Sequence, residues 1–547
     1  MSHSPDSKDA IALAAASLAV SALIWATLAA LRAGVGDPFQ IPVYRHLIFF
    51  QDFYAVAPFI AALALALLAP LRRMGAAAAG WCGRHVLLVA GLSGAALAAG
   101  TGLVYHHHPL SLDEYAVLFQ SRVFAAGRLT GQYPPALIDW LIPQFFQGRF
   151  VKPSYETGQV IAIYWPGFST LLTPFTALGT PWLLNPLLGA GTLLVVHQLA
   201  LRLFRDAQSA GYAVLFTLAS PAVTINAISY YSMPAHLLAS ALYALLLVEP
   251  TPRRALGAGL VGSAALLLHN PAPHLLFALP WIAWLATRPD RWRVLGALAA
   301  GYLPSIPLGW SWALFAENFG RGAGAHSIGA TVPAGNLLSR LLGRVFAWSS
   351  STGFSSHLLD LFKLWLWAVP ALVAAAALGA WRERPLRGPW LALAGSAALT
   401  YFGYFLVQFD QGHGWGFRYF HSAWLAVPLF AVCAIRRAPA LASYLGACAL
   451  LSLVVLTGFR AVQVEQYIAR HLAQRPAVAA GDARVTFVDI SRGYYAWDLI
   501  QNDPFLRGPI TFRVREPAAD RAMMAQRFPQ YELLGSDARG SVWGLRR

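Results

Sequence analysis

Long apolar runs separated by short polar segments dominate the chain. The runs lie near 10–33, 54–71, 85–105, 182–203, 210–228, 234–250, 255–272, 273–288, 294–316, 361–381, 389–407, 421–435 and 440–458. A helix needs roughly 20 mostly apolar residues to cross the hydrocarbon core of a bilayer. The pattern therefore predicts a polytopic α-helical membrane protein with about 13 transmembrane helices.

Arginine clusters follow every second apolar run, as the positive-inside rule requires of cytoplasmic loops. The clusters are Arg72, Arg73 and Arg84; Arg202 and Arg205; Arg253 and Arg254; Arg288, Arg291 and Arg293; Arg382, Arg384 and Arg387; and Arg436 and Arg437. This alternation predicts a cytoplasmic N-terminus and, with an odd helix count, a periplasmic C-terminus. It requires that the apolar segment 164–179 does not cross the membrane. The prolines and Gly167 of that segment favour a broken helix packed on protein at the interface.

Three regions are expected to project from the outer face. The loop 106–181 contains helix-like pieces at 112–126 and 135–146, and the loop 317–360 is rich in Gly and Ser, which is typical of a mobile lid. The tail 459–547 is polar, with strand patterns at 483–490 and 508–514 and a helix pattern at 517–528. We therefore expect an N-terminal transmembrane hairpin at 1–84, a membrane module at 85–458 and a small periplasmic α/β domain at 459–547.

Composition supports the membrane assignment and narrows the partners. Hydrophobic residues make up 57% of the chain and charged residues only 12%, whereas soluble domains average about 25% charged residues. The net charge of +16 is explained by membrane orientation and contact with anionic lipid rather than by nucleic acid. The sequence contains neither a phosphate-binding P-loop nor a dinucleotide fingerprint, so a nucleotide is not the expected substrate.

Ionisable residues are nearly absent from the middle of the predicted spans, where ion-coupled carriers usually place them. The polar candidates gather instead at the outer ends of the spans. They are His106 to Glu114, Lys152, Tyr155, Glu156, His236, His269, His274, Asp410, His413, Arg418 and His421. This one-sided distribution predicts chemistry at the outer membrane surface on a lipid-borne substrate.

Sugar transfer from a polyprenyl-phosphate donor fits this distribution, because no nucleotide sugar is available outside the cytoplasmic membrane. The phosphate leaving group is already stable as an anion and needs no general acid. A carboxylate must accept the proton of the attacking hydroxyl, and a cation must bind the phosphate. Asp113 suits the first role, and Arg418 suits the second because guanidinium binds phosphate through two parallel hydrogen bonds.

The segment "SLDEYAVLFQSRVFAAGRL" resembles the first outer loop of the GT-C glycosyltransferases, which include protein O-mannosyltransferases and the aminoarabinose transferase acting on lipid A. The segments "YWPGFSTLLTPFTALGTPWLLNPLLGAGTLLVVHQLALRLF", "SYYSMPAHLLASALYALLL" and "GFRYFHSAWLAVPLFAV" are also similar to family segments. The likeness extends from about residue 85 to 435. It implies a GT-C fold and an inverting transfer from a polyprenyl-phosphate-linked sugar, with the acidic pair carrying the base.

The chain also departs from this family pattern. The lipid A enzyme has a Lys-Pro-Pro element that helps to bind phosphate, but the aligned positions here read Trp165-Pro166-Gly167, and Lys152-Pro153 lies 13 residues earlier. Where many relatives have an Arg-Pro or a Lys, this chain has His269-Asn270-Pro271. The first two spans have no counterpart in the simplest members.

The predicted site includes several residues besides Asp113 and Arg418. The donor-binding candidates are Tyr419, Lys152, His269, His236, Tyr115 and Glu156, with Asp139 and His274 as further possibilities. Glu114 is the second catalytic candidate, although both acids also fit a helix N-terminus. Asp113, Glu114 and His108 could together hold a divalent cation, since consecutive histidines point in different directions and only one can join the acids. Arg418 has a structural alternative, an ion pair with Asp410.

The predicted reaction moves a sugar to an acceptor hydroxyl of a lipid, a glycan or a protein at the periplasmic face of a bacterial cytoplasmic membrane. A lipid-linked oligosaccharide flippase or ligase is the main alternative. A flippase would need a polar cavity that reaches the cytoplasmic side, and a ligase normally lacks the early Asp-Glu pair. A scaffold would leave that pair and Arg418 without a role.

Overall fold

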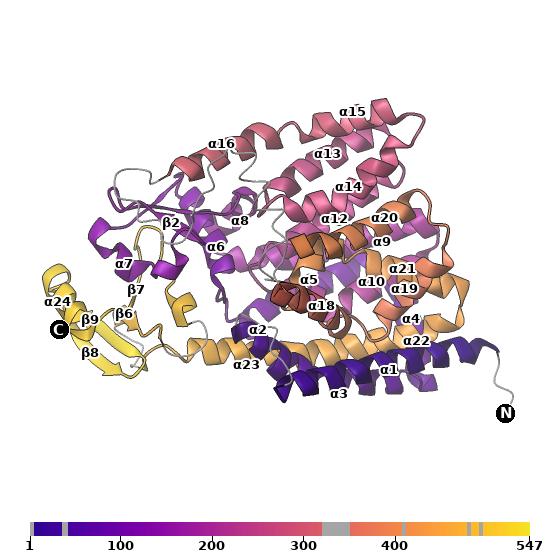
Figure 1. Cartoon of the computed structure of the whole chain (residues 1–547), viewed down its shortest axis with the longest axis horizontal. Coiled ribbons are helices and arrows are strands. Elements are labelled where there is room, and N and C mark those ends of the chain that lie inside the picture. The colour runs from indigo at the N-terminus through magenta and orange to yellow at the C-terminus, as the bar shows by residue number, and fades with distance from the viewer. Residues whose placement is uncertain are drawn as a thin grey trace.

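The computed structural model describes residues 5–34, 42–319, 351–406, 412–477, 483–491 and 496–546 (Figure 1). Most of them are helical. The helices of the N-terminal part are α1 (Pro5–Arg32), α2 (Pro42–His46), the π-helical η1 (Leu47–Asp52), α3 (Phe53–Leu65), α4 (Ala69–Arg84) and α5 (Val86–Leu103). The central helices are α9 (Leu184–Phe204), α10 (Ala207–Leu218), α11 (Pro221–Asn226), α12 (Met233–Leu247), α13 (Pro252–Leu267), α14 (Ala272–Ala286), α15 (Arg291–Tyr302), α16 (Ser305–Asn318), α18 (Ser351–Leu366), α19 (Leu372–Arg382), α20 (Pro389–Gly403), α21 (Ala426–Arg437) and α22 (Ala440–Leu451).

Five helical stretches among the described residues are long and apolar enough to cross a membrane. They are Lys8–Arg32, Val43–Leu65, Val86–Leu103, Pro181–Phe204 and Ala440–Leu472. Met233–Leu247, Ala272–Ala286 and Leu372–Arg382 are shorter apolar helices. The polytopic helical architecture is present, while several predicted single spans are interrupted. The run 361–381 is divided between α18 and α19, where Ala371 has a positive φ of 64°, and 294–316 is divided between α15 and α16.

The arginine-rich segment that follows the second predicted span forms helix α4 instead of a loop. Two glycines explain how α4 packs against its neighbours. A Cβ on Gly75 would lie 2.2 Å from the backbone nitrogen of Ala447, and one on Gly83 would lie 2.1 Å from the carbonyl oxygen of Ala207. The sequence pattern did not predict α4, because its arginines interrupt the apolar run. The helix packs on α22 and α10 through glycines, which add no apolar side chains to the pattern.

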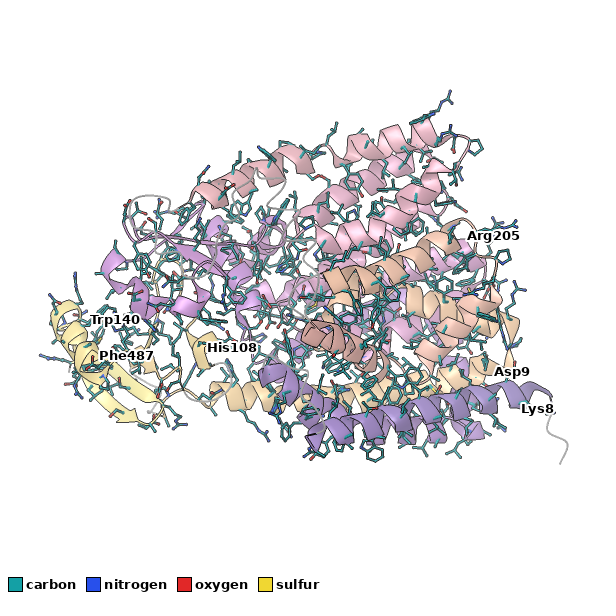
Figure 2. The ribbon with its side chains drawn as sticks, in the orientation of Figure 1. Lys8, Asp9, His108, Trp140, Arg205 and Phe487 are labelled. Atoms are coloured by element: carbon teal, nitrogen blue, oxygen red, sulfur yellow. The ribbon has the colours of Figure 1, made fainter. Side chains whose placement is uncertain are left out.

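Residues predicted for the two membrane faces lie at opposite ends of the molecule. Figure 2 shows Lys8, Asp9 and Arg205 at one end, and His108, Trp140 and Phe487 toward the other. The segment 164–179, expected to stay at the interface, forms α8 (Gly167–Ala177), which has 11 residues. At 1.5 Å per residue this helix is about half the thickness of the hydrocarbon core.

The end of the molecule predicted to face outward combines the loop 106–181 with the C-terminal segment. The loop contains α6 (Leu112–Ala125), α7 (Ile138–Leu141) and the antiparallel strands β1 (Gly131–Gln132), β2 (Val151–Pro153) and β3 (Gln159–Ala162), in the order β1-β3-β2. The C-terminal segment contains β6 (Ala483–Val488), β7 (Ile510–Arg513), α24 (Pro517–Arg527), β8 (Tyr531–Asp537) and β9 (Gly540–Leu545), in the order β7-β6-β9-β8. The expected strands at 483–490 and 508–514 and the helix at 517–528 are present; β6 and β7 pair in parallel.

The C-terminal sheet does not have a large core of its own. Val485, Phe487 and Phe512 of the sheet share one buried cluster with Tyr115 and Phe119 of α6. In Figure 1 this sheet lies beside α7, far from the N-terminus. The helix that contains the predicted span 440–458 continues through η7 (Ser452–Leu456) and α23 (Thr457–Leu472), so it extends to the edge of the outer region.

A buried group of charges joins three segments that the sequence keeps far apart. Asp52 Oδ2 accepts a hydrogen bond of 2.6 Å from Lys363 Nζ, and Asp52 Oδ1 lies 3.0 Å from an Arg460 nitrogen. Trp367 Nε1 donates to the same carboxylate at 2.7 Å. The middle of the predicted spans contains almost no ionisable residue, but the helices are longer than the apolar runs. Asp52 lies within Val43–Leu65 and Arg460 within Ala440–Leu472. The attraction between opposite charges and the hydrogen bonds offset the free-energy cost of burying these charged side chains.

Most of the expected mobile loop 317–360 falls at 320–350, outside the described residues, and so does Asp410. The described end of that loop, from Ser351, begins helix α18.

Candidate functional site

The site is built on the first turn of α6. Ser111 is the N-cap of this helix and forms a capping box with Glu114, so the sequence "SLDE" fixes where the helix begins. Successive residues of a helix point about 100° apart. Asp113, Glu114 and Tyr115 consequently face three different surroundings, and of the three only Asp113 lines the two cavities described below.

Glu114 is bound by the backbone. Its Oε2 accepts hydrogen bonds of 3.0 Å from the backbone N–H groups of Leu110 and Ser111, and its Oε1 accepts one of 2.9 Å from that of Tyr230. The side chain is fully buried and lines neither cavity described below. Burial raises the pKa of this carboxyl to about 7, against the opposing effect of these hydrogen bonds. Glu114 is therefore placed to hold the start of α6 against Tyr230, and not to touch a substrate.

Replacing Glu114 by Ala should lower the thermal stability of the protein in detergent. The change leaves two buried N–H donors, those of Leu110 and Tyr230, without their acceptor, at a cost of about 1–3 kcal/mol for each, and it also removes the acceptor of the partly buried Ser111 N–H. Glu156, an exposed residue of the same outer loop, is the matched control, and Glu156→Ala should leave the unfolding temperature unchanged. A Glu114→Ala variant as stable as the parent would contradict this role.

Asp113 forms an ion pair with Arg418, from which it is separated by 305 positions in the chain. Arg418 Nη1 donates to Asp113 Oδ2 at 3.1 Å, and the hydroxyl of Tyr164 donates to Asp113 Oδ1. Burial raises the pKa of Asp113, but the Arg418 guanidinium and the Tyr164 hydrogen bond outweigh burial and lower the pKa below its ordinary value. Asp113 is thus ionised at neutral pH, as a base must be.

A tight hairpin of two short strands, β4 (His413–Gly414) and β5 (Gly416–Phe417), places Arg418. Gly416 has a positive φ of 81°, a conformation that favours glycine. A Cβ on Gly414 would lie 2.6 Å from Arg418 Cδ, so the absent side chain leaves room for the arginine. The guanidinium lies 5.1 Å from the centre of the Tyr231 ring, within the range of a cation–π interaction.

Two cavities meet at this ion pair. Asp113, Tyr231 and Arg418 line both of them. The larger cavity has a volume of about 270 Å³ and the smaller about 120 Å³. The Asp113 carboxylate and the Arg418 guanidinium therefore lie where a molecule bound in one cavity would meet a molecule bound in the other.

Hydrogen-bonding side chains surround the larger cavity. Its further lining includes Tyr164, Ser232, His236, His269, Asn270, Tyr404, Tyr419 and Ser422. Among these, His236 Nε2, His269 Nδ1 and Ser422 Oγ are buried and have no hydrogen-bond partner. Buried polar atoms are nearly always paired, so these three side chains have hydrogen-bonding capacity left beside the cavity. Among the described residues, Asp113 is the only carboxylate that lines this cavity, which favours an anionic ligand.

The smaller cavity is lined by segments from both ends of the chain. Val43, Tyr44 and Leu47 come from the N-terminal hairpin, Tyr467 and His471 from α23, and Asp498 from the 3₁₀ turn η8 (Ala496–Leu499). Leu110, Ser111, Gly414 and Trp415 complete the wall. Asp498 adds a second carboxyl group, and its pKa is raised well above the ordinary value, first by burial and then by the charges of Asp113 and Glu114.

The structure brings together some of the residues predicted from sequence. Asp113, Arg418, Tyr419, His236 and His269 line the larger cavity. Tyr419 is fixed by parallel stacking on Tyr404, with ring centres 4.0 Å apart.

Other predicted residues lie elsewhere. Lys152 Nζ donates to the carbonyls of Ala316 and Glu317 at 2.9 and 3.3 Å; a cation is favourable at the end of α16, where carbonyls are unsatisfied. Tyr115 donates to the Asn502 carbonyl at 2.7 Å. Neither residue lines the larger cavity, so their predicted roles in donor binding are not supported.

The remaining candidates are also outside both cavities. Glu156 is exposed in a turn. Asp139 accepts a hydrogen bond of 2.7 Å from Tyr155, and His274 pairs with the Tyr302 hydroxyl at 2.7 Å.

The predicted metal set does not form a cluster. Glu114 faces the backbone, and His108 packs against His471, with ring centres 5.6 Å apart. Across the parts of the chain that the structure describes, no group of three or more His, Cys, Asp or Glu side chains is arranged to hold a metal ion.

Sequence reasoning missed Tyr164, Tyr231, Asn270, Ser422 and Asp498. The first two lie inside segments that carry the family resemblance, "YWPG" and "SYYSMPAHL", so the signal was present there. Asn270 follows a singled-out histidine. Nothing in the sequence around Asp498 connects it to Asp113, because the two meet only through the fold.

The chain resembles known structures in fold. It superposes on the crystal structure of ArnT from Cupriavidus metallidurans bound to undecaprenyl phosphate with a TM-score of 0.50 and 14% sequence identity, covering 82% of this chain and 97% of that one. The apo structure of the same ArnT gives a TM-score of 0.50 and 14% identity over 85% and 98% of the two chains. No protein-family model and no curated protein matches the sequence. The structural likeness confirms the predicted GT-C membrane fold.

Proposed function

We propose that this protein is an inverting glycosyltransferase that moves a sugar from a polyprenyl-phosphate donor to an acceptor hydroxyl at the periplasmic face of a bacterial cytoplasmic membrane. The observation that carries the proposal is the pairing of Asp113 with Arg418 where two cavities meet. In this arrangement the N-terminus is cytoplasmic and the C-terminus periplasmic.

The larger cavity is assigned to the phosphate and sugar of the donor. Arg418 contributes a permanent positive charge, and His236, His269, Asn270, Ser422 and Tyr419 contribute hydrogen-bonding groups. The ArnT crystal structure with bound undecaprenyl phosphate supports a polyprenyl phosphate as the lipid part of the donor.

The donor phosphate competes with Asp113 for the guanidinium. When the phosphate binds Arg418, the ion pair loosens, and Asp113 gains basicity because a major cause of its lowered pKa is withdrawn. Asp113 then accepts the proton of the acceptor hydroxyl while the acceptor oxygen bonds to the anomeric carbon. The bond from that carbon to the phosphate oxygen breaks, and polyprenyl phosphate leaves as an anion held by Arg418. A single displacement of this kind inverts the anomeric centre.

The value of kcat/KM for the donor should stay constant from pH 8 down to about pH 5. This parameter reports the groups of the free enzyme, in which the pKa of Asp113 lies below its ordinary value of about 3.9. Activity should therefore fall only when the pH approaches that lowered pKa and the base becomes protonated. A decline centred between pH 6 and 7 would identify a different base.

The proposal is tested with undecaprenyl phosphate as the probe and the full-length protein in nanodiscs. Saturable binding is expected, and deletion of the gene in the source bacterium should remove a glycosylated envelope product that mass spectrometry detects. Absence of both binding and product loss would overturn the proposal.

A further inference from the structure

We propose that the smaller cavity binds the acceptor, that the acceptor group there is a saccharide, and that Asp498 positions its hydroxyl toward Asp113. This inference rests on the proposed function, and it assigns a substrate class to the second of the two cavities.

The polar groups of the two cavities differ. Among the described residues, the larger cavity adds His236, His269, Asn270 and Ser422 to Arg418, whereas the smaller cavity adds a second carboxyl group, Asp498. Burial raises the pKa of Asp498 well above its ordinary value, and a protonated carboxyl group can both donate and accept hydrogen bonds, which suits an uncharged hydroxylated group. Because Asp113 lines both cavities, an acceptor in the smaller cavity would place its hydroxyl next to the base while the donor occupies the other side.

Aromatic rings give the smaller cavity its shape. Tyr44, Tyr231, Trp415 and Tyr467 all line it. Trp415 Nε1 donates to the Tyr105 hydroxyl at 2.6 Å, and Tyr467 meets Trp415 edge to face at 5.9 Å. The C–H faces of a sugar ring are apolar and match the negative faces of aromatic rings, while its hydroxyls need polar partners at the rim.

Asp498 is held in place by the start of the outer loop. Its carboxyl group accepts a hydrogen bond from the backbone of Leu112. The side chain of Gln501 donates both to the Asp498 carbonyl at 2.8 Å and to the Pro109 carbonyl at 2.6 Å. The turn η8 is thus fastened to the residues that begin α6. Asp498 and Asp113 therefore keep a fixed relation, with Asp498 buried to all but 5%.

The N-terminal hairpin closes the opposite wall. Tyr44 and Leu47 precede Asp52 on the same short stretch, and Asp52 is fixed by Lys363 and Arg460. Lys363 Nζ also lies 3.3 Å from the Gly414 carbonyl, in the hairpin that carries Arg418. The group formed by Asp52, Lys363 and Arg460 therefore connects the wall of the smaller cavity to the hairpin that carries Arg418. The N-terminal hairpin thus has a role in forming the acceptor cavity.

The test compares Asp498→Ala, Asp498→Asn and the matched control Asp503→Ala, a residue of the same segment outside both cavities. Each variant is expressed in the deletion strain, and mass spectrometry measures the ratio of glycosylated to unmodified acceptor. Asp498→Ala should lower this ratio at least tenfold. Asp498→Asn should recover part of it, because an amide can both donate and accept a hydrogen bond. Undecaprenyl phosphate binding in nanodiscs should be unchanged in all three.

The possible results separate this inference from the proposed function. Full product formation by Asp498→Ala, with the parent active, would overturn the acceptor assignment alone. Loss of undecaprenyl phosphate binding in Asp498→Asn would also overturn it, by showing that the smaller cavity serves the donor. If Asp498→Ala does not fold, Asp498→Asn decides. It should form less product than Asp503→Ala at the same lipid affinity, and equal product formation by the two variants would count against the inference. Failure of the parent to bind undecaprenyl phosphate, together with no loss of a glycosylated product in the deletion strain, would refute the proposed function.

Discussion

Asp113→Asn should abolish sugar transfer while leaving the protein folded and able to bind its lipid. A positioned general base contributes about 10²–10⁴-fold to a rate, and the amide of asparagine cannot accept the acceptor proton. Tyr164 and Arg418 donate to different oxygens of the Asp113 carboxylate. In asparagine the amide oxygen can accept from Arg418, and the amide N–H can donate to the Tyr164 hydroxyl. We expect a loss of product of that size in the deletion strain, with an unchanged unfolding temperature.

The same variant should bind undecaprenyl phosphate more tightly than the parent. The substitution removes a negative charge next to the phosphate and frees Arg418 from its 3.1 Å ion pair. Titration of the lipid in nanodiscs measures this directly. Full transfer by Asp113→Asn would exclude Asp113 as the base and would favour the flippase or ligase alternative. Weaker lipid binding would show that Asp113 and the phosphate do not compete for Arg418.

Arg418→Ala should lose both lipid binding and transfer. Hydrogen bonds to charged groups contribute about 1.5–3 kcal/mol, so affinity for undecaprenyl phosphate should fall by roughly 10- to 100-fold. The substitution also leaves Asp113 buried without its cation. The pKa of Asp113 should then rise, because burial is no longer outweighed by the guanidinium.

Arg418→Lys and Arg436→Ala provide the comparison. Lysine keeps the charge but not the paired donors of guanidinium, so Arg418→Lys should bind the lipid with intermediate affinity. Arg436, which donates to the Phe204 carbonyl at 3.0 Å and lines neither cavity, controls for general loss of positive charge. Equal lipid affinity in Arg418→Ala and the parent would remove Arg418 from the phosphate site.

Local patterns predicted the elements whose information lies within a few neighbouring residues. The apolar runs indicated the helical membrane class, the strand pattern at 483–490 predicted β6, and the helix-like piece at 112–126 predicted α6. Two features were not predicted. Helix α4 depends on close packing against α22 and α10. The break between α18 and α19 depends on the backbone conformation of Ala371.

The sequence by itself determined that this is a helical membrane protein with acids and an arginine at one end, and it identified Asp113 and Arg418 as a pair with complementary chemistry. Only the tertiary structure decided which other residues lie next to Asp113 and Arg418. Lys152, Tyr115 and Glu114 are of residue types that a phosphate or proton-transfer site uses, but their side chains point away from the site. Lys152 binds a backbone carbonyl, Tyr115 binds the carbonyl of Asn502, and Glu114 binds backbone N–H groups. Tyr164, Ser422 and Asp498 reach the site from separate segments. A cavity depends on contacts between residues hundreds of positions apart, and no local pattern in the chain encodes them.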